Sequence, residues 1–181
     1  MRKQILFSLL IILLSAVVKH ASAQYYHLEH LSTKNVLPDN SIQDIFKDAD
    51  GTIWLGTNGG LCKYNGADVK IYTTRDGLSK NWVWGITQDK HGMLWLATYG
   101  GGICSFDGKK FHTLALNDTI SKHFRVANYS SKYDCLLFGS SHGLYIKTPD
   151  TVFYFDGSNL GIKRFQVIAI HKVGEEFFIY T

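Results

Sequence analysis

Residues 37–57 read LPDNSIQDIFKDADGTIWLGT, and residues 78–98 read LSKNWVWGITQDKHGMLWLAT. The second stretch repeats the first 41 positions later: an Asn, two aliphatic residues, an Asp, a Gly and a Trp-Leu pair recur in the same order. After one inserted glycine the repeat continues at an offset of 42, from residues 60–62 (GLC) to residues 102–104 (GIC). A period of roughly 40 to 45 residues made of several short strands is typical of propeller blades.

Two weaker copies follow. Residues 138–144 (FGSSHGL) match residues 55–61 (LGTNGGL), with Leu137 in the place of the Trp, and a fourth copy runs from Val167 to Thr181. Repeats therefore begin near residues 37, 78, 119 and 160. We predict an all-β chain with about three and a half propeller blades of four antiparallel strands each, and we expect further blades beyond residue 181.

The order of the strands assigns a role to each end of a blade. In the first repeat we expect strands over residues 41–48, 52–57, 60–64 and 68–73, preceded by a strand of the fourth type over residues 28–31. Asp50-Gly51 and Asn65-Gly66 predict two-residue hairpin turns, because such turns need positive φ. These turns share one end of an antiparallel blade, and the second-to-third loops and the links between blades share the other. Ligand sites usually lie on irregular loops held by a rigid scaffold, so we place any ligand site at that second end.

Six residues in the irregular segments are candidates for ligand contact: Asn58, Arg75, Asn81, Trp82, Tyr99 and His142. The alternative is that each of them packs against the rim of its blade or is solvated there. Positions of the repeat motif are interpreted as structural: Asn40, Asp48, Gly51, Trp54, Thr57, Asp89, Gly92, Trp95 and Thr98. The two Trp are expected to fill the space between blades.

The first residues have the pattern of an export signal. A short basic start is followed by an apolar run over residues 5–18 and by Ala21-Ser22-Ala23, a small-x-small cleavage pattern. The run is too short to span a membrane, which takes roughly 17 to 25 residues. We therefore predict a signal peptide over residues 1–23, cleavage before Gln24, and a periplasmic or secreted chain over residues 24–181. An uncleaved anchoring helix is the alternative.

The mature chain is almost neutral, because three of the basic residues lie in the predicted signal peptide and leave 16 basic against 15 acidic residues. Without a cluster of Lys or Arg, direct binding of nucleic acid is not expected. Cys62 and Cys104 would lie on neighbouring sheets about 10 Å apart, which exceeds the roughly 7 Å that a disulfide allows between Cα atoms. We expect these two and Cys135 to be small buried thiols.

Patterns for catalysis and metal binding are weak. Residues 139–143 match the G-x-S-x-G nucleophile elbow, which needs a strand-to-helix turn, yet they overlay residues 56–60 of a β blade. Asp48 to Gly51 resembles part of a calcium loop, but Phe46 stands where the first acidic ligand belongs. The eight His residues show no paired metal-ligand spacing. We expect no enzyme activity, no metal and no cofactor.

The string Leu-x-x-Asn-x-Ile/Val-x-x-Ile-x-x-Asp-x-x-Gly-x-Ile/Leu-Trp-Leu-Gly/Ala-Thr, found over residues 37–57 and 78–98, closely resembles the two-component regulator propeller family. The resemblance implies a periplasmic sensor that binds a small molecule or an oligosaccharide, belongs to a histidine-kinase signalling protein, and can form a homodimer. The kinase motifs are absent from this sequence, so the signalling domains are expected in the part of the parent protein beyond the missing blades. The alternative is a secreted propeller enzyme, a glycan lyase or hydrolase, which would need paired carboxylates; the irregular loops offer only Asp76.

Overall fold

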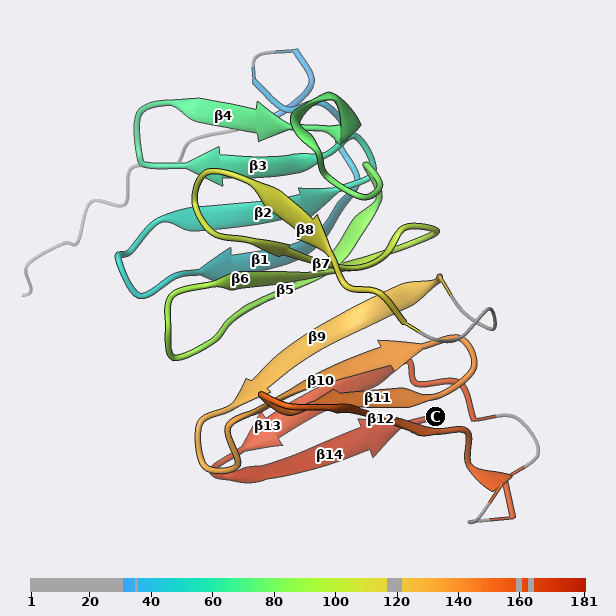
Figure 1. Cartoon of the computed structure of the whole chain (residues 1–181). Helices are drawn as coiled ribbons and strands as arrows, with labels where there is room; N and C mark the ends of the chain where they lie inside the picture. The colour runs from blue at the N-terminus through green and yellow to red at the C-terminus, as the bar shows by residue number, and fades with distance from the viewer. Residues whose placement is uncertain (1–30, 35, 117–121, 159–160, 163–164) are drawn as a thin grey trace, which may run out of the picture. The chain divides into compact units, whose positions relative to one another are not determined.

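The computed structural model describes residues 31–34, 36–116, 122–158, 161–162 and 165–181. Within this part the chain folds into three four-stranded antiparallel sheets and one two-stranded sheet, in chain order (Figure 1). The predicted signal peptide, its cleavage site and residues 28–30 of the predicted first strand lie outside the described residues. No helix among the described residues is long and apolar enough to cross a membrane.

Each sheet is a simple meander in which consecutive strands pair. The first sheet contains β1 (Ile42–Lys47), β2 (Ile53–Thr57), β3 (Leu61–Tyr64) and β4 (Val69–Tyr72). The second contains β5 (Val83–Gln88), β6 (Leu94–Thr98), β7 (Gly102–Phe106) and β8 (Phe111–Thr113). The third contains β9 (Phe124–Ser130), β10 (Cys135–Ser140), β11 (Leu144–Lys147) and β12 (Val152–Phe155), and the fourth β13 (Ala169–Val173) and β14 (Glu176–Tyr180). The four strands predicted for the first repeat are confirmed to within one residue at each end.

The tight turns differ from the prediction, one in length and the other in position. Asp48 N–H donates to Thr52 O and Gly51 N–H to Asp48 O, so the β1–β2 loop has three residues and ends on Gly51 at φ 86°. The β3–β4 loop has two residues and begins on Gly66 at φ 97°. The glycines adopt positive φ as expected. The two-residue turn predicted at Asp50-Gly51 is wrong, and the one predicted at Asn65-Gly66 has two residues but lies one position later, at Gly66-Ala67. The reason is that a side chain holds each loop: the Asp48 Oδ1 accepts from the Asp50 and Thr52 amides, and the Asn65 Oδ1 from the Ala67 and Asp68 amides.

The motif Asp also fixes the motif Trp. Trp54 Nε1 donates to Asp48 Oδ2 at 2.8 Å, and Trp95 Nε1 donates to Asp89 Oδ2 at 2.8 Å. The Trp54 ring is buried and lies 6.0 Å from the Phe106 ring of the second sheet. The prediction that the Trp fills the space between blades is therefore confirmed for Trp54, and its acidic partner satisfies the indole N–H that this packing buries.

Neighbouring sheets pack face to face through apolar layers. The first layer joins Trp54 and Tyr72 to Val83 and Ile86 of the next sheet; the second joins Ala97 to Phe124. The third joins residues 137 and 144 to residues 167 and 170. Cys104 is a buried free thiol in the first layer, and Cys62 is a buried free thiol in a separate cluster with Leu37 and Leu55. Burial raises the pKa of Cys62 to about 11. Cys135 is only half-buried, contrary to expectation, because it opens β10 beside the turn and packs against the edge of the third layer.

Candidate functional site

The loops and links that were expected to share one end of the sheets are tied together by backbone hydrogen bonds. Tyr99 N–H donates to Trp82 O at 2.9 Å, Gly100 N–H to Lys122 O at 2.7 Å, and Ser141 N–H to His123 O at 3.2 Å. The β6–β7 turn is thus fastened to the segment that starts its own sheet and to the segment that starts the next one, and the β10–β11 turn is fastened to the segment that starts its own sheet. We call this end, formed by residues 58–60, 73–82, 99–101, 122–123 and 141–143, the linker face.

An aromatic cluster, Trp82, Trp84, Tyr99 and His123, occupies the linker face. Tyr99 stands at its centre, with ring centroids 5.7 Å from Trp82, 5.0 Å from Trp84 and 4.4 Å from His123. The Trp84 and Tyr99 rings are stacked, with an angle of 22° between their planes. Trp82 is 45% exposed and forms the solvent side of the cluster. An exposed Trp supported by a second aromatic ring is a rigid, amphipathic surface for a ligand.

Arg125 completes this group from the third sheet. Its guanidinium carbon lies 5.0 Å from the Trp84 ring centroid and 5.7 Å from that of Tyr99. Cation–π attraction holds the guanidinium over the two rings, so a positive charge of one sheet is positioned by the aromatic residues of another.

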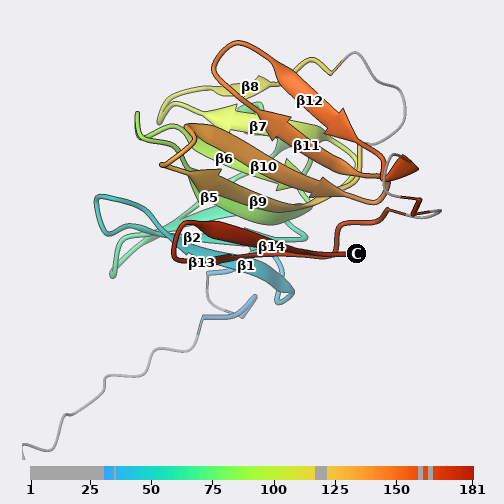
Figure 2. The same cartoon turned by 90° about the horizontal axis from the view of Figure 1, so that it is seen from below.

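Trp84 and Arg125 also line a hollow of about 530 Å³. Its walls come from the first strands of all four sheets, β1, β5, β9 and β13, together with Ile168 just before β13; these four strands are labelled in Figure 2. Its polar lining includes Gln43, Asp44, Asn128 and His171. A hollow with a few polar groups and an aromatic cluster at one end has the composition of a ligand pocket.

A local irregularity in the first strands places these side chains. The register of β1 against β2 shifts between Ile42 and Asp44, and that of β5 against β6 shifts between Val83 and Gly85. Phe124 and Val126 pair with consecutive residues of β10, which leaves Arg125 as the extra residue of the third sheet. A β-bulge re-aims the side chain of its extra residue. Gln43, Trp84 and Arg125 therefore occupy the same repeat position at the edge of the hollow.

Asp44 is the one carboxylate among the described residues that line the hollow. Its Oδ2 accepts from the Ile86 amide at 2.7 Å and its Oδ1 from the Ile45 amide at 2.9 Å. Burial raises the pKa of Asp44 above its ordinary value, and the two amides oppose this only in part. The carboxylate thus ties the first strand of one sheet to that of the next.

Trp82 and Tyr99 are the two sequence-predicted candidates that the structure brings together. Asn81 Oδ1 instead accepts from the Thr74 amide at 2.9 Å, as Asn40 Oδ1 accepts from the Thr33 amide at 2.8 Å in the first repeat. The structure therefore gives Asn81 a scaffold contact that is repeated from blade to blade.

The other three candidates make separate contacts. Asn58 Oδ1 accepts from Gln43 Nε2 at 3.2 Å, and Arg75 belongs to a 3-10 helical turn, Thr74–Asp76. The His142 Nδ1 lies 2.8 Å from Ser141 Oγ in the β10–β11 turn. A strand follows this turn, so the G-x-S-x-G match does not form the strand-to-helix elbow that the motif needs.

Trp84, His123 and Arg125 were missed by the sequence analysis. A signal for them exists: residues 43, 84 and 125 share one repeat position and residues 41, 82 and 123 another, yet their side chains differ. Asn58 and Gln43 hold the positions of Tyr99 and Trp84, so a polar pair in the first sheet becomes an aromatic stack in the second. Positions whose side chains differ between otherwise similar repeats are therefore the sequence signal for these residues.

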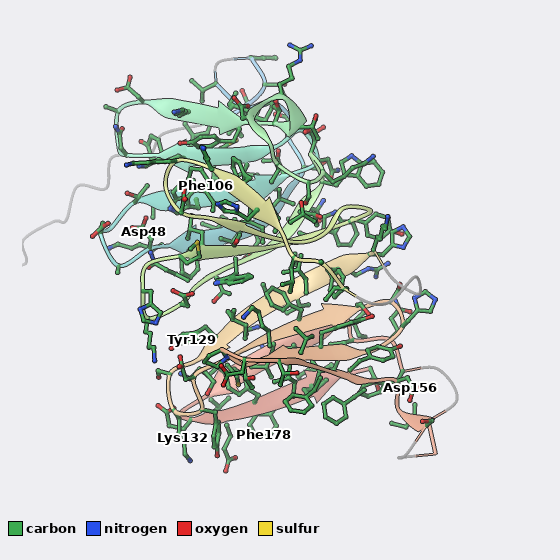
Figure 3. All side chains as sticks on the ribbon, in the orientation of Figure 1. Asp48, Phe106, Tyr129, Lys132, Asp156 and Phe178 are labelled. Carbon is green, nitrogen blue, oxygen red and sulfur yellow. The ribbon has the colours of Figure 1, made fainter. Side chains whose placement is uncertain are left out.

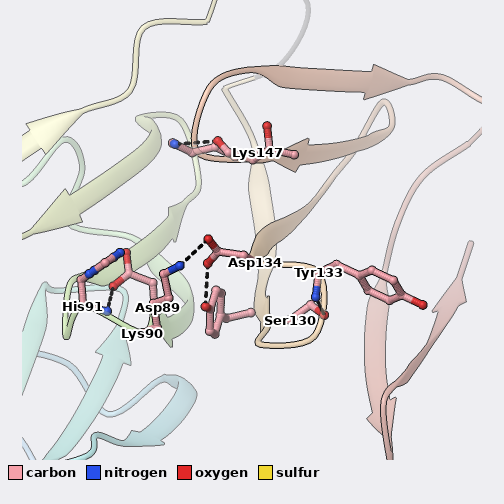
Figure 4. Close-up of polar contacts among 9 residues, drawn as sticks. Asp89, Lys90, His91, Ser130, Tyr133, Asp134 and Lys147 are labelled. Carbon is pink, nitrogen blue, oxygen red and sulfur yellow. Dashed lines mark hydrogen bonds and ion pairs between the residues drawn. The ribbon is translucent and has the colours of Figure 1, made fainter.

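The opposite end of the sheets, where the glycine turns lie, carries polar contacts between the second and third sheets. Lys90 Nζ lies 2.6 Å from Asp134 Oδ2, and Tyr129 O–H donates to Asp134 Oδ1 at 2.8 Å (Figure 4). Asp134 has φ 47°, at the turn where the first two repeats have Gly. The Lys90 ammonium and the Tyr129 hydroxyl lower the pKa of Asp134. No group of side chains suited to a metal ion occurs among the described residues.

Antiparallel four-stranded sheets that pack face to face, with their first strands around a common hollow, define this protein as a β-propeller protein. Residues 36–59 and 77–100 match the model of the family described as two component regulator propeller. Comparison with curated proteins gives no match.

Solved structures share this fold. The extracellular domain of the putative hybrid two component system BT3049 from B. thetaiotaomicron matches 87% of this chain with a TM-score of 0.72 and 21% identity. That of the putative hybrid system BT4673 from the same organism matches 86% with a TM-score of 0.68 and 17% identity. This chain spans 23% and 21% of those two chains.

An enzyme with a related fold is also found. A catalytically inactive virginiamycin B lyase from Staphylococcus aureus, solved with quinupristin, matches 66% of this chain and 43% of its own, with a TM-score of 0.55 and 20% identity. At these identities the likeness shows a shared fold.

Proposed function

We propose that this chain is part of the exported sensor region of a two-component signalling protein and that it recognises an oligosaccharide at the linker face. The observation that carries the proposal is the aromatic cluster, in which the exposed Trp82 and the central Tyr99 stand beside a polar hollow. The two-component regulator propeller repeats and the extracellular location of similar domains support the sensing role.

The chemistry of the cluster suits a sugar. The apolar face of a pyranose ring packs on an indole or phenol ring, and amide and imidazole groups can bind its hydroxyls. Trp82 and Tyr99 offer the rings, and Gln43, Asn128 and His171 offer polar groups in the lining of the hollow. Because Tyr99 is fixed by rings on several sides, the surface is preorganised and binding orders few side chains.

Binding is a better match to this site than hydrolysis. Glycosidases use two carboxyl groups about 5 to 10 Å apart, whereas Asp44 is the single carboxylate in the described lining of the hollow. Asp76, the carboxylate singled out in the sequence, accepts from Thr73 N–H and Oγ1 in a capping box. We propose that ligand binding is passed to signalling domains outside this chain, with a homodimer as the signalling unit.

The test is a binding measurement on the full-length protein without its signal peptide. Calorimetry with a panel of oligosaccharides is expected to show binding that Trp82→Ala weakens by about tenfold or more, as for an aromatic anchor. Asp107→Ala, on the opposite end of the second sheet, serves as the matched control and keeps the wild-type affinity. Equal loss of affinity in both variants at unchanged folding would mean that the site lies elsewhere. Turnover of a bound sugar would favour the alternative function, a secreted propeller enzyme.

A further inference from the structure

Two hydrogen-bond donors at the edge of the hollow have no acceptor. Trp84 Nε1 and Arg125 Nε are shielded from solvent, and neither has a hydrogen-bond partner among the described residues. Trp54 and Trp95 differ from Trp84, because each of their indoles donates to an Asp of its own blade. Leaving a buried donor unpaired costs free energy, so an unpaired donor at a pocket calls for an explanation.

The charge of Arg125 is likewise without a carboxylate partner among the described residues. Asp44, the carboxylate that shares the hollow, accepts from the amides of Ile86 and Ile45 instead. The Arg125 guanidinium lies over Trp84 and Tyr99, and these rings hold its charge in place without neutralising it. The result is a positioned cation and an indole N–H side by side at a pocket rim.

We propose that Trp84 and Arg125 bind the carboxylate of an acidic sugar, a uronic acid residue of the oligosaccharide. A planar carboxylate matches the fork of a guanidinium, which donates two parallel N–H bonds to it, and the second donor nearby is the Trp84 indole. The ring that carries this carboxylate packs toward Tyr99 and Trp82. This inference rests on the proposed function and adds the chemical class of its ligand.

The residues of the site come from two sheets, and their combination makes the site selective. Trp82, Trp84 and Tyr99 belong to the second sheet and its link, and Arg125 to the third. The aromatic residues can bind any sugar face, whereas Arg125 and the Trp84 N–H increase the affinity only for a ligand with a negatively charged oxygen. Affinity for neutral sugars and preference for acidic ones are therefore separable by mutation.

The experiment uses matched pairs of oligosaccharides from pectin, hyaluronan and alginate, each with free carboxylates or as the methyl ester. The full-length protein is expected to bind the free acid at least tenfold more tightly than its ester. Arg125→Gln and Arg125→Lys should bring this ratio toward one with little effect on the ester, whereas Trp82→Ala should weaken both forms. Lys132→Gln is the matched control, because Lys132 also lies over an aromatic ring, Tyr133, but at the glycine-turn end (Figure 3).

The outcomes separate the two proposals. Equal binding of acid and ester, or an acid preference that survives both Arg125 variants, overturns the acidic-sugar site and leaves the proposed function standing. Failure of the wild-type protein to bind any member of the panel overturns both. Folding of each variant is checked by near-ultraviolet circular dichroism, in which the stacked Trp84 and Tyr99 contribute. Arg125→Lys keeps the positive charge and tests the guanidinium fork separately.

Discussion

A single carboxylate organises each of the first two blades. Asp48 accepts from two amides of its own turn through Oδ1 and from the Trp54 indole through Oδ2, and Asp89 makes the same three contacts with residues 91, 93 and 95. The carboxylate can do this because it has two oxygens with several lone pairs and no donor of its own. Turn geometry and Trp orientation are therefore coupled through one residue.

Replacing Asp48 by Ala should lower the free energy of unfolding by about 1–3 kcal/mol, since it leaves the buried Trp54 N–H without an acceptor. Urea titration followed by Trp fluorescence measures this. Asp50→Ala in the same turn, where the side chain is exposed, should stay within about 0.5 kcal/mol of wild type. Equal effects of the two variants would contradict the role given to Asp48.

Asp44 should make the stability of the protein depend on pH. Because burial raises its pKa in the folded state, its contribution to stability is full below its ordinary pKa of 3.8 and is lost as the pH rises through the raised value. Asp44→Asn, which keeps an oxygen for the Ile86 amide, should be more stable than wild type at pH 7 and equal to it below that range. Thermal melts across pH 3 to 7 measure the difference.

Asp156→Asn is the control, because it should change the pH dependence of stability in the opposite direction. Hydrogen bonds from Ser158 lower the pKa of Asp156, so its contribution is present at neutral pH and is lost as the pH falls. This variant should be less stable than wild type at pH 7 and equal to it in acid. The same pH trend in both variants would be inconsistent with the environments described for these two carboxyl groups.

At the scale of elements, the first strands of neighbouring sheets approach so closely that small residues are needed between them. A Cβ on Gly85 would lie 2.7 Å from the Ala127 amide nitrogen and 3.1 Å from Arg125 O, so β5 and β9 meet backbone to backbone. This approach brings Arg125 of one sheet over Trp84 of the other. The site therefore depends on the distance between two strands as well as on its own side chains.

Gly85→Val should destabilise the protein by about 1–3 kcal/mol, because backbone atoms cannot move aside as a flexible side chain would. It should also disturb the contact between Trp84 and Arg125, with a change in Trp fluorescence before unfolding begins. His112→Val, on the exposed outer strand of the same sheet, is the control and should change stability by no more than about 0.5 kcal/mol. Wild-type stability of Gly85→Val would mean that β5 and β9 lie farther apart.

At the scale of the whole molecule, each sheet relies on its neighbour to cover its apolar side chains. Val83 and Ile86 on β5 are 0% and 3% exposed, whereas Ile42 and Ile45 at the same positions of β1 are 40% and 65% exposed. Among the described residues no sheet covers this side of β1. Phe178 and Tyr180 on β14 are about half exposed as well. Further blades and a homodimer, expected from the sequence, stay predictions.

The repeat supplies an internal comparison for this exposure. Ile45→Lys should change the melting temperature little and should lower the self-association of residues 24–181, because it places a charge on an uncovered apolar surface. Ile86→Lys, at the equivalent buried position, should unfold the chain because the charge has no partner in the apolar layer. Analytical ultracentrifugation and thermal melts test both. If the two variants behave alike, the side of β1 is covered in solution.

Much of this molecule could be predicted from the sequence because its blades are encoded locally and repeatedly. In the first two blades, a repeat of 41 residues, a Gly in each tight turn and an Asp six residues before Trp54 and Trp95 specify strands, turns and the orientation of these indoles without any long-range information. The end of the sheets that carries the aromatic cluster followed from connectivity, and Trp82 and Tyr99 were identified there. The sequence could not show that the Asn81 side chain holds the linker, because a side chain that does so has the same composition as one that binds a ligand.

Only the tertiary structure decided which positions of different repeats meet. Arg125 lies 41 residues after Trp84 and holds the same place in its own blade, and nothing in that spacing says that it stacks on the preceding blade. The β-bulges, the close approach at Gly85 and the hollow between the first strands arise when sheets pack against each other. Local patterns specify each blade because its strands are neighbours in the chain. The site lies between blades, so its geometry depends on packing that no single repeat contains.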